Sequence, residues 1–334
     1  MSLRISINGF GRIGRLVAKH AIEFDDIELV AVNDIVDAKT LAHLLQYDST
    51  YGKLPYKVEL SGDKIKVKNK EFTCFMIKDP KELPWRDLNV DIVIEATGVF
   101  RNYEKAKLHL EAGAKKVIVT APMKDKADCT IVMGVNETTY NPKEHNIISN
   151  ASCTTNCLAP MVKILHKNFG IERGFMTTIH AYTMDQRLLD APHKDLRRAR
   201  AASLSIIPTT TGAAKAIGLV IPELAGKLDG MAIRVPTPDV SIVDLACIVK
   251  KSTSKDEINE IFKRASQNEL KGYLEYCDKP LVSIDFVGNT HSCIFDASLT
   301  YADANFVKVY GWYDNEYGYA CRVVDLARYI GAKL

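Results

Sequence analysis

Residues 3–34 read LRISINGFGRIGRLVAKHAIEFDDIELVAVND, and this stretch decides the fold of the N-terminal part of the chain. The apolar run Leu3–Ile7 predicts a strand, and apolar residues at helical spacing predict a helix over Arg12–Phe24. A second β-branched run, Ile27–Val32, predicts another strand. A strand, a helix and a strand in this order predict a parallel β-α-β unit with a Gly-x-Gly-x-x-Gly turn after its first strand.

The glycine motif consists of Gly9, Gly11 and Gly14 and fits a dinucleotide site. Gly9 permits the turn, Gly11 lets the backbone approach a pyrophosphate, and Gly14 lets the helix pack on the strand. The free N–H groups at the start of the helix favour the diphosphate charge. Asp34 stands at about the 20-residue spacing expected for the acidic partner of the adenosine ribose, where its carboxylate opposes a 2′-phosphate. The motif therefore predicts NAD binding; a tight turn without a ligand is the alternative.

Further cofactor contacts are expected where later strands of the same sheet end. Strands are predicted over Asp91–Glu95, Lys116–Val119 and Ile131–Val135, and an antiparallel meander is predicted within Tyr56–Ile77. Ligands of such sheets bind beyond the carboxyl ends of the strands. We therefore expect three residues that follow these strands to contact the cofactor: Thr97, Gly98 and Thr120.

After Asn150 the pattern changes to longer strands with alternating side chains, among them Gly174–His180, Ser241–Val249 and Cys293–Thr300. These strands and their long connections predict a mostly antiparallel sheet with helices on one face. The fold class is therefore an α/β Rossmann cofactor domain plus an α+β catalytic domain with a mostly antiparallel sheet. The expected boundaries are residues 1–150 and 315–334 for the cofactor domain and 151–314 for the catalytic domain.

Length and composition agree with a two-domain globular protein. The chain has 334 residues and a formal net charge of +3, which gives no case for nucleic acid as the primary partner. We find no signal peptide and no apolar run near the ~18 residues that span a bilayer, so we expect a cytoplasmic protein without a membrane partner. In that compartment the eight cysteines are expected to be free thiols.

The segment SNASCTTNC, residues 149–157, follows a predicted strand and opens a helix. Ser152 is a suitable N-cap, which places Cys153 in the first turn, where the helix dipole stabilises a thiolate. Cys157 lies one turn further from that field. Two alternatives compete with a nucleophile: buried core thiols, and half of a metal site. No second cysteine pair with suitable spacing accompanies the first, so no metal site is predicted.

His180 is the candidate partner of Cys153, because it ends a predicted strand just past the helix that Cys153 opens. Strand ends and helix N-termini of an alternating unit meet on the same side of the sheet. A cysteine and a histidine brought together there form an activated nucleophile. From position alone, a core histidine with satisfied hydrogen bonds explains His180 equally well.

Several longer motifs make the chain similar to one family from end to end. They are INGFGRIGR at the start, ASCTTN around Cys153, HAYT around His180, then DLRRARAA, IIPTTTGAAKA, RVPTP and WYDNEYGY. The sequence resembles the phosphorylating glyceraldehyde-3-phosphate dehydrogenases. The resemblance implies a Rossmann domain, a catalytic domain, a C-terminal helix that returns to the cofactor domain, and a homotetramer.

The resemblance also implies roles for individual residues, with Cys153 as the nucleophile and His180 as its base. The implied cofactor contacts are Arg12, Ile13, Asp34, Lys78, Thr120 and Asn315. One implied phosphate-binding set consists of Ser152, Thr154, Thr211 and Gly212. The other consists of Thr183, Arg198 and Arg234. Hydroxyl, backbone N–H and guanidinium groups are natural partners of phosphate, so each assignment is chemically sensible.

The implied reaction is the reversible, NAD-dependent conversion of glyceraldehyde 3-phosphate and inorganic phosphate to 1,3-bisphosphoglycerate, used in glycolysis and gluconeogenesis. It proceeds through a thioester on Cys153. Two alternatives remain: the related erythrose-4-phosphate dehydrogenases, which differ at the phosphate loop, and RNA binding by the basic run at residues 193–200. Ala191 resembles part of the pattern of NADP-using members, so weaker use of NADP is also expected.

Overall fold

The structure is a computed structural model that describes residues 2–334, and it contains two compact units. The first unit comprises the chain up to Ile131 together with Glu137–Ala151 and Ala320–Leu334. The second comprises Val132–Asn136 and Ser152–Tyr319. In the part of the chain described, no helix is long and apolar enough to cross a membrane.

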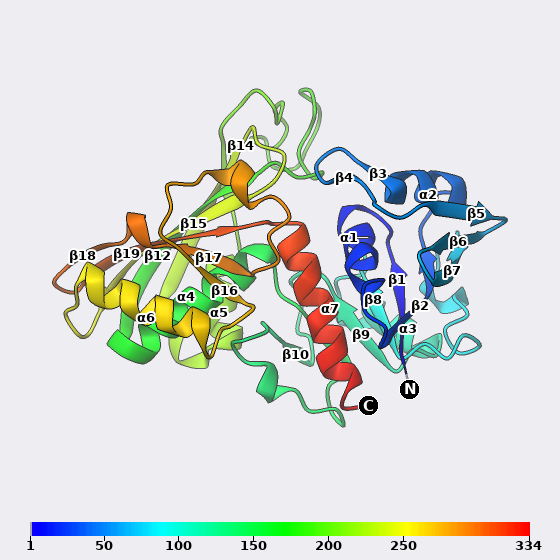
Figure 1. Cartoon of the computed structure of the whole chain (residues 1–334), viewed down its shortest axis with the longest axis horizontal. Helices are drawn as coiled ribbons and strands as arrows, with labels where there is room; N and C mark the ends of the chain where they lie inside the picture. The colour runs from blue at the N-terminus through cyan, green and yellow to red at the C-terminus, as the bar shows by residue number, and fades with distance from the viewer. Residues whose placement is uncertain (1) are drawn as a thin grey trace. The chain divides into compact units, whose positions relative to one another are not determined.

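The first unit is built on a nine-stranded sheet with the strand order β10-β11-β9-β8-β1-β2-β7-β6-β5 (Figure 1). Its strands are β1 (Leu3–Asn8), β2 (Ile27–Asn33), β5 (Val58–Ser61), β6 (Lys64–Val67), β7 (Lys70–Phe75), β8 (Ile92–Glu95), β9 (Lys116–Val119), β10 (Cys129–Thr130) and β11 (Ile147–Ser149). The pairs from β10 to β7 are parallel, whereas β5, β6 and β7 pair antiparallel. The Rossmann prediction is thus confirmed, and the meander forms one edge of the sheet.

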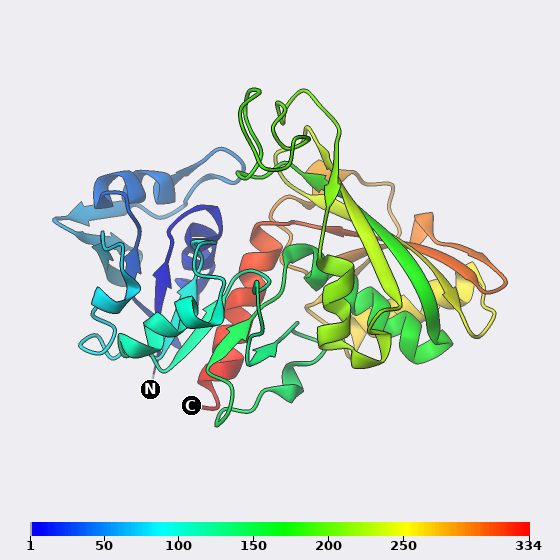
Figure 2. The same cartoon turned by 180° about the vertical axis from the view of Figure 1, so that it is seen from behind.

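Helices cover this sheet. They are α1 (Arg12–Ala21), α2 (Ala38–Gln46), α3 (Tyr103–Glu111) and the later turns of α7 (Tyr317–Gly331). A small pair, β3 (Tyr47–Asp48) and β4 (Gly52–Lys53), and two 3-10 turns, Pro80–Glu82 and Glu137–Thr139, complete the unit. The helix α1 lies in front of the sheet in Figure 1, and α3 lies in front of it in the reverse view of Figure 2.

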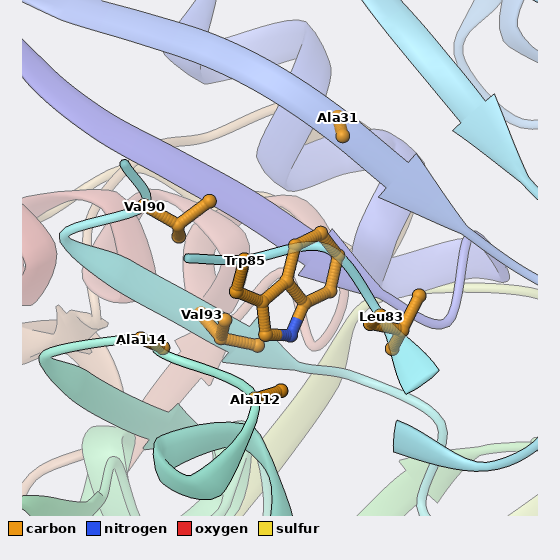
Figure 3. Close-up of a cluster of buried hydrophobic side chains, with 7 residues drawn as sticks. All are labelled: Ala31, Leu83, Trp85, Val90, Val93, Ala112 and Ala114. Carbon is orange, nitrogen blue, oxygen red and sulfur yellow. The ribbon is translucent and has the colours of Figure 1, made fainter. Parts of the chain in front are cut away.

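The central strands of this sheet are apolar on both faces because helices cover both. Trp85 is fully buried beside them, and Figure 3 shows its indole among small and branched side chains. The members of this cluster are Ala31, Leu83, Trp85, Val90, Val93, Ala112 and Ala114. Such close packing fixes β2 and β8 within the sheet, and the predicted contacts Asp34 and Thr97 follow these two strands.

The second unit is built on an eight-stranded sheet with the order β13-β14-β12-β15-β19-β17-β16, and β18 pairs with β19. Its strands are β12 (Ile171–Ala181), β13 (Ile207–Thr210), β14 (Leu228–Val235), β15 (Ser241–Val249), β16 (Leu274–Cys277), β17 (Cys293–Asp296), β18 (Tyr301–Asp303) and β19 (Phe306–Tyr313). Only β12–β14 and β16–β17 are parallel pairs. The sheet is therefore mostly antiparallel, as predicted.

The helices of the second unit are α4 (Cys153–Phe169), α5 (Ala213–Val220), α6 (Lys255–Gln267) and the first turn of α7. Three short 3-10 helices add Pro222–Leu224, Ser283–Phe286 and Ala297–Leu299. The helices α4 and α6 lie on one face of the sheet in Figure 1, and the strands β12 and β14 face the viewer in Figure 2.

Three predicted elements differ from the structure. Residues 131–135 form no strand: Met133–Val135 lie in a turn, where Gly134 has a positive φ of 80°, and the Asn136 side chain accepts the Val132 N–H. The strand that starts at Cys293 ends at Asp296, whose side chain caps a 3-10 helix. The helix that starts at Arg12 ends at Ala21, three residues earlier than predicted.

Candidate active site

The helix α4 begins at Cys153, and the residues before it fix that start. The Ser152 hydroxyl accepts the Thr155 N–H at 3.0 Å, so Ser152 is the N-cap that the sequence predicts. Ala151 directly precedes it with a φ of +56°, a left-handed conformation that is costly for a residue with a side chain. Backbone strain of this kind concentrates at functional sites, and here it immediately precedes the Cys153 turn.

Cys153 and His180 lie together in the second unit. The Cys153 Sγ is 3.5 Å from the His180 Nε2, which the end of β12 presents to the first turn of α4. The His180 Nδ1 is 2.7 Å from the Ala181 carbonyl oxygen, which can only accept a hydrogen bond. Nδ1 therefore carries the proton, and the lone pair of Nε2 faces the thiol.

Burial sets the charge state of this pair. Burial, reinforced by the Arg234 charge, lowers the pKa of His180 to about 3. Burial also raises the pKa of the Cys153 thiol, while Arg234 and hydrogen bonds with Thr154 oppose that rise. Desolvation thus opposes the helix N-terminus, which favours a thiolate, and it favours the neutral forms of both the thiol and the imidazole.

Arg234 joins this pair to a cluster of anion-binding groups. Its Nη1 donates to the Ala181 carbonyl at 3.0 Å and to the Thr183 hydroxyl at 3.1 Å. The same nitrogen is 3.0 Å from His180 Nδ1, but a protonated Nδ1 cannot accept a hydrogen bond. Arg198 donates through Nε to the Thr209 hydroxyl at 3.0 Å and through Nη2 to the Thr210 carbonyl at 3.2 Å.

The predicted phosphate set of Ser152, Thr154, Thr211 and Gly212 lies around the starts of α4 and α5. The Thr154 hydroxyl is bound to the Tyr313 hydroxyl at 2.9 Å, and the Ser152 hydroxyl is engaged as the N-cap. Thr211 accepts the Ala213 N–H at 3.2 Å. Gly212 is the N-cap of α5 and has no side chain, so apart from the Ala213 N–H the first turn of α5 can offer N–H groups to an anion.

Tyr313 is a site residue that the sequence analysis missed. Its buried hydroxyl lies 2.9 Å from Thr154 Oγ1 and 2.8 Å from Thr178 Oγ1, and so it links α4 to β12. Its ring meets the His180 ring edge-on, with the centroids 5.9 Å apart. The motif WYDNEYGY contains this residue, but its spacing gives no signal of the contact.

In the first unit, the turn between β1 and α1 has the geometry of a phosphate cradle. Gly9 has a φ of +94°, and a Cβ there would lie 2.5 Å from Thr97 N. A Cβ on Gly14 would collide with the Gly9 carbonyl oxygen, whereas a Cβ on Gly11 would meet nothing within 4 Å. Gly11 caps α1 without a side chain, so this helix also presents free N–H groups.

Asp34 lies at the end of β2 and is tied to the glycine turn. Its Oδ2 accepts the Phe10 N–H at 2.7 Å, and its Oδ1 accepts the Ile35 N–H at 2.7 Å. These bonds fix the carboxylate beside the turn and leave further lone pairs for ribose hydroxyl groups. The glycine turn and Asp34 together fit a dinucleotide such as NAD.

Thr97 and Thr120 meet at Glu95, which ends β8. The buried Glu95 carboxylate accepts the Thr97 hydroxyl and N–H, and the Glu95 carbonyl accepts the Thr120 hydroxyl at 3.1 Å. Gly98 follows with a φ of +71°. The three predicted contacts therefore share one edge of the sheet with the glycine turn.

The remaining predicted cofactor contacts lie in different places. Arg12 forms an ion pair with Asp48 at 2.9 Å on the first turn of α1, where Ile13 follows it. Lys78 is exposed beyond β7. Asn315 belongs to the second unit, where its Oδ1 accepts the Ser241 hydroxyl at 2.7 Å.

The surroundings of the cysteines bear on the alternative that Cys157 is a buried core thiol. All eight cysteines are free, and Cys157 is fully buried with its thiol 3.4 Å from the Gly311 carbonyl. Among the described residues, no group of three or more histidine, cysteine or acidic side chains is arranged to hold a metal.

A Rossmann-type unit and a unit that carries a cysteine–histidine pair are features of dehydrogenases that act through a thiol. Residues 3–103 match the sequence model for "Glyceraldehyde 3-phosphate dehydrogenase, NAD binding domain". Residues 152–315 match the model for "Glyceraldehyde 3-phosphate dehydrogenase, C-terminal domain".

Whole-chain relatives agree with both matches. Glyceraldehyde-3-phosphate dehydrogenase from Geobacillus stearothermophilus is 58% identical over 334 residues, which cover 100% of this chain and 99% of the relative. The Mycobacterium avium protein of the same name is 57% identical over 341 residues and is covered completely. Glyceraldehyde-3-phosphate dehydrogenase 2 from Bacillus subtilis is 54% identical, with 98% of it covered. The chain belongs to the glyceraldehyde-3-phosphate dehydrogenase family.

Proposed function

We propose that this protein catalyses the reversible, NAD-dependent oxidative phosphorylation of D-glyceraldehyde 3-phosphate to 1,3-bisphosphoglycerate. One observation carries the proposal: the Cys153 thiol faces the lone pair of His180 Nε2 at 3.5 Å, beside two arginines, in a chain of this family. A thiol, a base and an anion-binding cluster are the groups that this reaction needs.

NAD is the cofactor, and when bound it would supply the acceptor for the hydride of the substrate. In our assignment Gly9, Gly11 and the N-terminus of α1 receive the pyrophosphate, and Asp34 receives the adenosine ribose. The assigned contacts also include Arg12, Ile13, Gly14, Lys78, Thr97, Gly98, Thr120 and Asn315. The corresponding domains are residues 1–150 with 315–334 for the cofactor and 151–314 for catalysis.

In the first step, Cys153 attacks the aldehyde carbon. The lone pair of His180 Nε2 faces the thiol and takes its proton. The carbon–sulfur bond forms, and the protonated His180 returns this proton to the former carbonyl oxygen, which gives a hemithioacetal. His180 then takes the proton of its hydroxyl as the hydride departs, which leaves a thioester on Cys153. The Cys153 N–H at the start of α4 and the protonated His180 stabilise the developing oxyanion.

In the second step, inorganic phosphate attacks the thioester carbonyl, the carbon–sulfur bond breaks, and Cys153 leaves as a thiolate that regains the proton. Thr183, Arg198 and Arg234 form one anion site, and Ser152, Thr154, Thr211 and Gly212 form the other. The two sites hold the phosphate ester of the substrate and the attacking phosphate. Together, the two steps replace one difficult reaction by two easier ones.

An assay of NADH formation tests this function. Glyceraldehyde 3-phosphate with NAD should give sustained NADH only when inorganic phosphate is present, because phosphate alone releases the acyl group. Erythrose 4-phosphate should be a much poorer substrate. A higher kcat/KM with erythrose 4-phosphate would assign the chain to that activity instead, and NADH formation independent of phosphate would contradict the phosphorylating step.

The proposal includes a cytoplasmic homotetramer. Residues 182–206 leave the end of β12 as a long loop with exposed apolar side chains, among them Met184 at 86% and Leu196 at 81% exposure. The less buried side chains of β15 include apolar residues as well, for example Ile242 and Ile248. Exposed apolar side chains gathered in one segment are typical of interfaces. A fully active, stable monomer in sedimentation would contradict the tetramer.

A further inference from the structure

A carboxylate occupies the donors that the proposed function reserves for a phosphate group. Asp185 accepts the Thr183 hydroxyl on one oxygen and Arg198 Nη1 on the other. Thr183 and Arg198 are two of the three groups assigned above to one anion site. Arg234 shares the Thr183 hydroxyl at 3.1 Å, so the hydroxyl that Asp185 binds also belongs to the third group of the site.

The local backbone holds Asp185 over these donors. Gln186 N–H donates to the Thr183 carbonyl at 3.0 Å, and the Gln186 side chain accepts the Thr183 N–H at 3.2 Å. The resulting turn places the intervening Asp185 beside the Thr183 hydroxyl. The Asp185 side chain is 41% exposed, so rotation about its own bonds can move the carboxylate into water without a change of the turn.

Asp185 is an anion in this position. Burial raises the pKa of its carboxyl group, but the Thr183 hydrogen bond and the charges of Arg198 and Arg234 outweigh that effect and keep the pKa below its ordinary value. At neutral pH the cluster therefore holds a carboxylate in charge-assisted hydrogen bonds.

A carboxylate and a phosphate oxygen cannot both accept the single hydrogen of the Thr183 hydroxyl, and they compete for the same side of Arg198. Thr183 Oγ1 has a single hydrogen to donate, and it is given to Asp185. Arg198 already spends Nε on Thr209 and Nη2 on the Thr210 carbonyl, so its Nη1 is the nitrogen that points to Asp185. Arg234 Nε is buried and has no hydrogen-bond partner within residues 2–334, which leaves a donor for a further anion.

We propose that Asp185 is an internal competitor of phosphate, which occupies the Thr183–Arg198 donors in the free enzyme and must swing out before a phosphate group binds there. The inference rests on the proposed function for the identity of the anion. Its role is to weaken phosphate binding at this site, so that the phosphate group is held no more tightly than turnover and release require. Asp185 thus tunes the affinity of this site for a phosphate group.

The phosphate group at this site can be inorganic phosphate or the phosphate ester of the aldehyde, and the kinetics distinguish them. In Asp185→Asn and Asp185→Ala we expect the KM for one of the two to fall about threefold to tenfold, the effect of one charge-assisted contact. The substrate whose KM falls is the one that uses the Thr183–Arg198 donors. The control is Asp229→Asn, an exposed residue on β14 that makes the same change of charge away from the cluster and should leave both KM values unchanged.

Sulfate binding tests the same idea without turnover. The dissociation constant of sulfate, measured by calorimetry on the full-length protein, should fall by a similar factor in both Asp185 variants and stay unchanged in Asp229→Asn. Thr183→Val should abolish this gain when it is combined with Asp185→Ala, because the released donor is then missing. Tighter sulfate binding without any phosphate-dependent NADH formation would contradict the proposed function but support the internal competitor.

Three results would overturn the inference. Weaker or unchanged sulfate binding in Asp185→Ala would show that the carboxylate orients Arg198 for the anion and does not compete with it. A gain in Asp185→Asn alone would show that the new amide donates a hydrogen bond. Unchanged KM values for both substrates would remove Asp185 from the reaction.

Discussion

Two buried histidines, one in each unit, differ in how their ring nitrogens are used. His109 on α3 is 0% exposed; its Nδ1 accepts the Trp85 indole N–H at 3.1 Å, and its Nε2 lies 3.0 Å from the Glu95 carboxylate. His180 on β12 is 4% exposed; its Nδ1 donates to a carbonyl, but its Nε2 faces only the Cys153 thiol. Burial alone therefore does not separate a structural histidine from a catalytic one.

The surroundings of the two rings explain the difference. Around His109, the Glu95 carboxylate also accepts the Asn8 amide at 2.6 Å and both polar groups of Thr97, and Asn33 binds Asn8 at 2.7 Å. This network fixes the ends of β1, β2 and β8 under the cofactor turn. Fully satisfied networks rigidify a core, whereas a lone pair left beside a nucleophile is available for proton transfer.

The largest expected effect concerns Cys153. Cys153→Ser should lower kcat by at least about 10⁴-fold, because the hydroxyl is a far weaker nucleophile beside the same base. Cys157→Ala should retain most of the activity, since Cys157 is fully buried one helical turn away. Substoichiometric iodoacetamide should label Cys153; dominant labelling of Cys157 would reverse the assignment.

The next largest effect concerns His180, the histidine whose Nε2 faces the thiol. His180→Asn should slow turnover by about 10²–10⁴-fold, the typical loss for a general base, and should slow alkylation of Cys153. NAD affinity should change little, because His180 lies in the second unit and the assigned pyrophosphate and ribose contacts lie in the first. Normal turnover in this variant would remove His180 from the mechanism.

His109→Ala should instead reduce stability. The substitution leaves the Trp85 N–H and one side of Glu95 without a partner and opens a cavity, which together cost about 3–5 kcal/mol in the free energy of unfolding. His43→Ala on the exposed face of α2 should change it by about 0.5 kcal/mol or less. A His109 variant that keeps full stability but loses turnover would contradict a purely structural role for His109.

The lowered pKa of His180 should make the stability of the protein depend on pH. The pKa of His180 is lowered to about 3 in the folded protein, whereas an unfolded histidine titrates near 6.5. Between these values only the unfolded state takes up the proton, so the contribution of His180 is complete above pH 6.5 and is lost as the pH falls toward 3. The difference in unfolding free energy between wild type and His180→Asn should shrink by up to about 1.4 kcal/mol per pH unit. A constant difference would contradict a neutral, buried His180.

The smallest expected effect concerns cofactor choice. Asp34→Gly should shift the kcat/KM ratio toward NADP by about tenfold, the scale of one charge-assisted contact. It should also weaken NAD binding, because Asp34 anchors the Phe10 N–H of the glycine turn. Ala191→Leu should reduce NADP use more than NAD use. Equal or better wild-type turnover with NADP would show that Asp34 does not select NAD.

The sequence predicted the parts of the fold that follow from local pattern. The glycine turn, the Ser152 N-cap and the alternating strand Ser241–Val249 appear as predicted, because periodicity and capping chemistry are local. The strand predicted at residues 131–135 is wrong, because the apolar residues there fit a strand pattern although Gly134 turns the chain with a positive φ.

The candidate site was predicted less completely for the same reason. Cys153 and His180 stand out because a helix start and a strand end are visible in sequence. Tyr313 and Asp185 do not, since their roles depend on contacts across the sheet and within a loop. The sequence also does not reveal that His180 Nε2 keeps a lone pair for the thiol, whereas both ring nitrogens of His109 have polar partners, because the hydrogen-bond partners are known only from the structure.

The central claim is that the substrate becomes a thioester on Cys153. The most direct measurement is mass spectrometry of the intact protein and its peptides after mixing with NAD and glyceraldehyde 3-phosphate in the absence of phosphate. We predict one phosphoglyceryl adduct per chain on the Cys153 peptide, formed with one NADH and removed by added phosphate. NADH formation without an adduct on Cys153, or an adduct that phosphate does not remove, would contradict the account.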